Sequence, residues 1–99
     1  MAQVSARLAT MVEADFSPHD AEQVLEALRG IPESLPLGEK QDAERLQTAV
    51  VLSARGDLSR FEAALREAHR DWRDLLMSAD LAHGYWPDRL DAELGPRST

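Results

Sequence analysis

Four side chains in the second half of the chain have types that could do chemistry, namely Arg66, His69, Arg70 and Arg73. An imidazole can act as a general base or bind a metal, and guanidinium groups grip carboxylates and phosphates. Helical spacing aligns the arginines on one side and puts His69 beside Trp72 at the border of an apolar face. Acidic residues are interleaved throughout the segment, so a solvated charged face is the favoured interpretation. The four residues are a possible polar site, not a catalytic one.

No other group of residues forms a catalytic or metal-binding motif. The sequence has no cysteine, and its three histidines, His19, His69 and His83, lack the i, i+4 spacing of helical zinc sites. The five glycines are scattered, so there is no glycine-rich phosphate loop. Acids near His19 could hold Ca²⁺, but a helix N-terminus also attracts acids and no calcium-loop motif is present. The sequence predicts no catalytic residue, no metal and no cofactor.

The charge balance narrows the classes of partner. Asp and Glu number 18 against 11 Lys and Arg, which gives a formal net charge of −7 over 99 residues. A chain this acidic repels phosphate polymers and anionic lipids, so we expect no nucleic acid and no membrane as partner. No apolar run approaches the roughly 20 residues of a membrane span. Residues 1–4 lack the basic and apolar parts of a signal peptide, so a cytoplasmic location is expected.

The composition favours helices. The sequence has 15 Ala and 14 Leu but only one Ile, five Val and three Thr, whereas strands need β-branched residues. Apolar spacing and capping residues predict helices over about residues 2–14, 18–29, 39–55, 58–79 and 86–94. We expect an all-α protein, a four-helix bundle with a short fifth C-terminal helix. Residues 1–95 form a single domain in this prediction, and residues 96–99 are a frayed tail.

Local signals predict several helix ends. Ser17 is the expected cap of the second helix, with Pro18 at the first helical position. Asp80 is expected in the left-handed conformation after the long fourth helix, with Leu81 packing back on that helix. Trp72 is expected midway along a continuous core stripe of the fourth helix. The members of the stripe are Phe61, Leu65, Ala68, Trp72, Leu75, Leu76 and Ala79.

The third predicted helix carries more apolar surface than one core-facing stripe needs. Three consecutive residues from Val50 to Leu52 span about 200° of a helix, so this helix is either central or part of an interface. Leu35 and Leu37, in the linker that precedes the helix, either cover this surface within the chain or form part of the interface with it. We predict a homodimer whose interface includes Leu35, Leu37, Val51 and Leu52.

One segment resembles a known group of proteins. The strings Gly56-Asp57-Leu58, Asp71-Trp72-Arg73-Asp74-Leu75-Leu76 and Trp86-Pro87 lie within residues 44–95. In this half of the chain the sequence resembles small uncharacterised actinobacterial helical proteins. The resemblance implies a helical fold and no activity.

Together these patterns favour a non-catalytic protein–protein interaction module over an enzyme, because no constellation of catalytic residues is present. The alternative is a small-molecule or metal-binding protein with a pocket between helices near His69. A hollow with converging polar groups would favour the alternative, and an exposed apolar patch would favour protein contact.

Overall fold

The computed structural model describes residues 4–31, 43–82 and 84–95. Its helices are α1 (Ala6–Asp15), α2 (Pro18–Arg29), α4 (Ala43–Ala54), α5 (Leu58–Ser78) and α6 (Trp86–Leu94). The described ranges contain no strand, so the all-α prediction is confirmed. The four-helix bundle with a short fifth helix stays a prediction. The predicted helix start at residue 39, linker residues 32–38 and tail residues 96–99 lie outside the described residues.

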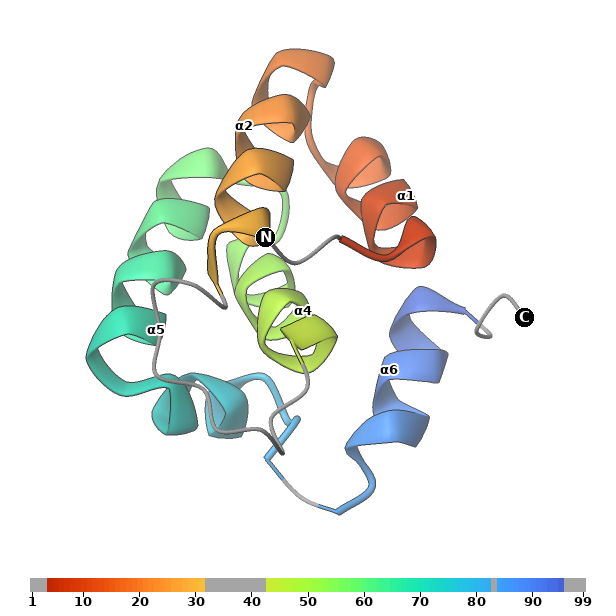
Figure 1. The fold of residues 1–99 in the computed structure, drawn as a ribbon, viewed down its shortest axis with the longest axis vertical. Coiled ribbons are helices and arrows are strands. Elements are labelled where there is room, and N and C mark those ends of the chain that lie inside the picture. The colour runs from red at the N-terminus through yellow and green to blue at the C-terminus, as the bar shows by residue number, and fades with distance from the viewer. Residues whose placement is uncertain (1–3, 32–42, 83, 96–99) are drawn as a thin grey trace.

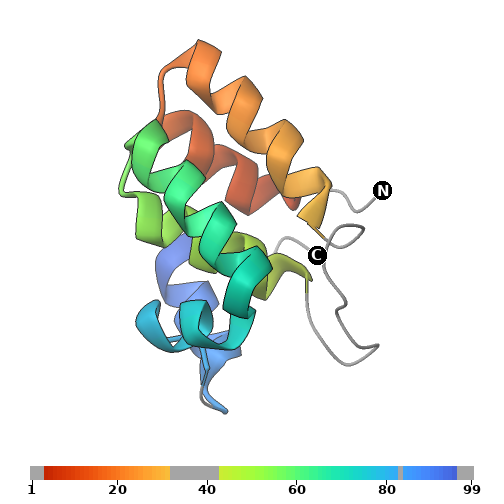
Figure 2. The same cartoon turned by 90° about the vertical axis from the view of Figure 1, so that its left-hand side faces the viewer.

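Helix α4 lies at the centre of the described structure. It forms an antiparallel hairpin with α5 and also contacts α1 and α6 (Figures 1 and 2). Six consecutive α4 side chains are buried, and these are Leu46, Gln47, Thr48, Ala49, Val50 and Val51. A helix that contacts neighbours on several sides buries more than one stripe. Of the two explanations for the wide apolar surface of this helix, a central position therefore accounts for Val50 and Val51.

The caps confirm several local predictions. The Ser17 hydroxyl accepts the Asp20 amide N–H at 3.4 Å at the start of α2. Asp80 has φ +61°, and the Leu81 amide donates to the carbonyl of Leu76 at 2.8 Å. This is the Schellman arrangement, in which the residue after the left-handed position packs back on the helix. Leu81 is fully buried, as that arrangement requires.

The turn between α4 and α5 lies tightly against the end of α1. Gly56 has φ +78°, and a Cβ atom there would be 2.8 Å from the carbonyl oxygen of Asp15. Glycine meets both constraints because it has no side chain. Just beyond these residues, the Phe16 ring meets the Phe61 ring edge-on with centroids 6.3 Å apart. The turn thereby joins the α1–α2 hairpin to the α4–α5 hairpin.

Helix α5 differs from the prediction of one continuous helix. Asp71 leaves helical geometry at φ −156° and ψ 89°, and its carboxylate accepts the Asp74 amide N–H at 3.3 Å. Asp71 thus acts as the N-cap of a new helical segment within α5. Trp72, the first residue after the break, is only partly buried. Trp72 packs against the core without being enclosed by it, so the prediction of a core position is confirmed only in part.

Candidate functional site

The possible polar site does not form a single cluster. His69 is exposed, and its ring Nδ1 donates to the Leu65 carbonyl one turn earlier, at 2.8 Å. Arg70 pairs with Glu67 at 2.8 Å, and Arg66 is exposed on the same helix. Arg73 instead stacks on Trp72 beyond the break in α5. His69, Arg70 and Arg73 therefore each contact a different residue along the helix and do not converge.

The break in α5 also brings two carboxyl groups together. The Glu67 carboxyl, one turn before the break, shares a hydrogen bond with Asp74 and raises the pKa of Asp74. Two nearby carboxylates repel each other when both are charged, and this repulsion also raises the pKa of Asp74. Among the described residues, no three histidine, aspartate or glutamate side chains gather closely enough to hold a metal ion.

A hollow of about 270 Å³ lies where α4 faces the second part of α5. Its described lining residues are Arg45, Trp72, Arg73, Leu76, Met77 and Ala82. Met77 is 69% exposed, although it is a large apolar side chain. We call this group of six residues the Trp72 hollow. It combines an apolar floor with two cationic side chains.

Both arginines of the Trp72 hollow stack on tryptophans. The Arg73 guanidinium carbon lies 5.2 Å from the centroid of the Trp72 ring, and that of Arg45 lies 5.0 Å from Trp86. The Arg45 Nε also donates to the Leu81 carbonyl at 2.7 Å, which ties α4 to the end of α5. Stacking of this kind is a cation–π contact within the usual limit of about 6 Å. The two arginines are consequently held in place and do not swing freely.

Two other hollows differ in charge. One, of about 400 Å³ between α1 and α2, is lined by Glu13, Pro18, Ala21, Glu22 and Leu25. The other, of about 470 Å³, has lining residues of both charges, which are Leu52, Ser53, Arg55, Ser78, Ala79, Asp80, Arg89 and Glu93. His69 lines neither of them nor the Trp72 hollow. None of the three hollows therefore provides the pocket near His69 that the alternative function requires.

The residues of the predicted dimer interface differ in how deeply they are buried. Val51 is fully buried within a single chain, so its proposed place on an exposed interface is wrong. The physical reason is the central position of α4, which uses this side chain in the core. Leu52 is partly buried and lines the hollow of mixed charge. Leu35 and Leu37 lie outside the described residues.

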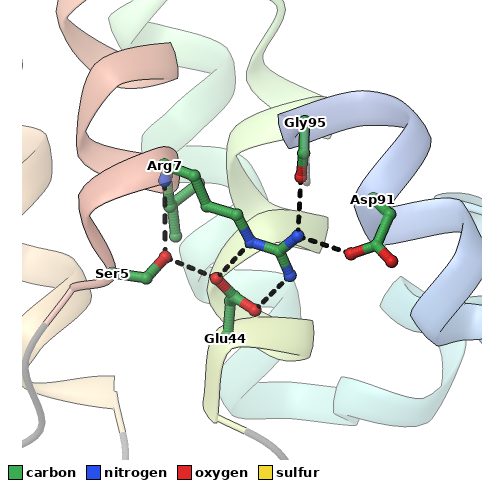
Figure 3. Close-up of polar contacts among 6 residues, drawn as sticks. Ser5, Arg7, Glu44, Asp91 and Gly95 are labelled. Atoms are coloured by element: carbon green, nitrogen blue, oxygen red, sulfur yellow. Dashed lines mark hydrogen bonds and ion pairs between the residues drawn. The ribbon is translucent and has the colours of Figure 1, made fainter. Parts of the chain in front are cut away.

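The sequence interpretation missed a partly buried ion-pair network, which Figure 3 shows. Arg7 is only 9% exposed and donates to both carboxylate oxygens of Glu44, at 2.7 and 3.0 Å. It also donates to Asp91 at 2.6 Å and to the Gly95 carbonyl at 2.8 Å. The Ser5 hydroxyl, which caps α1, donates to Glu44 as well. These contacts join α1, α4 and α6.

Electrostatics keep Arg7 charged. The hydrogen bonds to Glu44 are the largest influence on the Arg7 guanidinium, and they raise its pKa further above its ordinary value. The only sign of this network in the sequence is the position of Arg7. Its helical spacing places it beside Val4, Leu8 and Met11, on the apolar side of the first predicted helix. A charge on an apolar stripe needs a partner when it is buried. The sequence gives no indication that this partner comes from α4 and α6.

Comparisons with known proteins add no family. No family model matches the chain, and neither the curated proteins nor the solved structures include a match. The resemblance to actinobacterial helical proteins therefore stays a prediction. No helix in the described ranges is both long enough and apolar enough to span a membrane.

Proposed function

We propose that this protein is a non-catalytic protein–protein interaction module and that the Trp72 hollow is its contact surface. The observation that carries the proposal is the exposure of Met77, which is 69% accessible beside the partly buried Trp72. Tryptophan, methionine and arginine are enriched where proteins meet, and tryptophan and arginine supply much of the binding energy there. All three residue types line this one hollow.

The alternative, a small-molecule or metal-binding protein, has less support. It needs polar groups that converge in a pocket near His69. Instead, His69 is exposed and hydrogen-bonded to its own helix, and Arg70 is paired with Glu67. The Trp72 hollow offers mainly apolar surface at its floor, which suits a side chain of another protein better than a small polar ligand.

The proposal also covers the cellular location and the oligomeric state of the protein. We propose that it acts in the cytoplasm and that it forms a homodimer. The dimer interface would have to lie elsewhere than at Val51, since that side chain is used in the core. Sedimentation equilibrium over a range of micromolar concentrations tests the dimer. A mass of 11.0 kDa at every concentration would exclude it.

Co-purification from cells that produce the protein naturally tests the interaction function. The tagged full chain is compared with Met77→Glu, which places a charge at the exposed edge of the hollow. Ala63→Glu is the matched control, because Ala63 is exposed on the same helix but does not line the hollow. We expect at least one protein that the wild type and Ala63→Glu retain and Met77→Glu loses. Retention of the same proteins by all three would contradict the proposal.

A further inference from the structure

The charge of the Trp72 hollow is opposite to that of the chain as a whole. Arg45 and Arg73 line it, and its described lining contains no acidic side chain. The hollow between α1 and α2 has the reverse character, with Glu13 and Glu22 around an apolar floor. Two apolar hollows lined by side chains of opposite charge would bind different partner proteins, because like charges brought together at a contact are unfavourable.

The net charge of −7 does not cancel the positive charge of the arginines that line the Trp72 hollow. At physiological ionic strength, charges separated by more than about 8 Å are largely screened from one another in solvent. The arginines at the edge of the Trp72 hollow act at contact distance, where screening is weakest. The chemistry of the closest side chains therefore decides which partner fits.

Arg73 is well prepared to bind a carboxylate. Its guanidinium stacks on Trp72, and it forms no ion pair with any residue that the structure describes. A stacked guanidinium still presents N–H groups along its edge, and these can bind a carboxylate with two parallel hydrogen bonds. Because the stacking already restricts the side chain, binding costs less conformational entropy than it would for a freely moving arginine.

From these observations we infer that the occupant of the Trp72 hollow is a protein segment with a large apolar side chain flanked by carboxylates, an inference that rests on the proposed function. The apolar side chain packs against Trp72 and Met77. The neighbouring carboxylate accepts hydrogen bonds from Arg73.

Short synthetic peptides on a neutral glycine–serine frame test this inference. The four probes carry Glu-Phe-Glu, Gln-Phe-Gln, Lys-Phe-Lys or Glu-Ser-Glu at the centre, so charge and apolar anchor vary separately. Titrations are followed by the NMR signals of the Trp72 indole and the Met77 methyl group. We expect Glu-Phe-Glu to shift both signals and to bind about fivefold more tightly than Lys-Phe-Lys, a ratio typical of one exposed charge pair. Glu-Ser-Glu should bind more weakly than Glu-Phe-Glu.

The variant Arg73→Gln should reduce the preference for the acidic peptide below about twofold, whereas Arg66→Gln should leave it unchanged. Arg66 is the matched control because it is exposed on α5 away from the hollow. Equal binding of the acidic and basic peptides, or no shift with any peptide, would overturn the inference. A partner that depends on Met77 together with indifferent peptides would leave the proposed function standing and remove only this inference. If the acidic peptide binds but no cellular partner depends on Met77, the preference of the hollow for acidic segments stands and the proposed function is contradicted.

Discussion

Arg7 shows how one side chain can hold several elements of a small protein together. It pairs with Glu44 on α4 and Asp91 on α6, and its side chain is only 9% exposed. Loss of one partner from a buried pair leaves the other charge without compensation, which costs more than the pair itself contributes. The network therefore ties α1, α4 and α6 together, and its polar groups are occupied by one another.

Replacement of the Arg7 charge should destabilise the protein strongly. We expect Arg7→Met to lower the free energy of unfolding by about 3 kcal/mol, because the variant removes the hydrogen bonds that Arg7 donates to Glu44, Asp91 and the Gly95 carbonyl. Urea denaturation of the variant and the wild type measures the difference. Arg66→Met is the control, and as a surface change it should alter stability by less than about 0.5 kcal/mol. Equal small losses for both variants would show that the Arg7 pairs contribute little.

Thr48 contrasts with Arg7, because its buried polar group has no hydrogen-bond partner among the described residues. The side chain is fully buried, and the polar group is its hydroxyl. We expect Thr48→Val, which keeps the shape and removes the hydroxyl, to raise the free energy of unfolding by about 1 kcal/mol. Thr10→Val is the control, since the exposed Thr10 hydroxyl donates to the Ala6 carbonyl. A loss of stability in Thr48→Val would mean that the hydroxyl is satisfied in solution.

At the scale of elements, local signals were readable from the sequence and distant contacts were not. Ser17 and Asp80 could be assigned because a cap or a left-handed residue is determined by its immediate neighbours. The break at Asp71 was missed, since an aspartate within a helical pattern can cap a new segment or simply face solvent. The Trp72 hollow was missed because Arg45 and Ala82 meet the second part of α5 only through distant contacts in the fold.

The turn from α4 to α5 should tolerate no side chain at Gly56. We expect Gly56→Ala to cost at least about 1 kcal/mol, because the residue has a positive φ and its Cβ would press on the α1 backbone. Gly84→Ala is the matched control, since a Cβ at Gly84 meets no atom within 4 Å and its φ is not in the left-handed range. Thermal unfolding of both variants measures the difference. Similar melting temperatures for the two would contradict the close approach of the turn to α1.

The carboxyl pair across the break in α5 should make stability depend on pH. A hydrogen bond with Glu67 raises the pKa of Asp74. An acid with a raised pKa in the folded state stabilises that state below its unfolded pKa, and this contribution is lost as the pH rises through the folded pKa. Asp74→Asn, which removes the charge, should therefore match the wild type at pH 3 and melt at a higher temperature at pH 7.

Glu26→Gln serves as the control for Asp74→Asn because Glu26 is exposed on α2, away from the break. Melting temperatures at the two pH values are compared for all three proteins. If Asp74→Asn raises the melting temperature equally at both pH values, repulsion between Glu67 and Asp74 is not the cause of the increase.

At the scale of the whole molecule, charge and apolar surface are distributed unevenly. The chain carries a formal net charge of −7, yet the Trp72 hollow presents arginines around an exposed methionine. The core, in contrast, is made of side chains from all five described helices. The helices and the ion pairs of Arg7 hold the fold together, and the Trp72 hollow is the surface that we propose for contact with another protein.

Site-specific photo-crosslinking in cells that produce the protein tests the central claim most directly. A benzophenone amino acid replaces Met77 in one version of the chain and Ala63 in another, both exposed positions on α5. We predict that irradiation links a discrete second protein to the chain with the probe at position 77 and not to the chain with the probe at position 63. Crosslinks of equal yield at both positions, or none at position 77, would contradict the assignment of the Trp72 hollow as the contact surface.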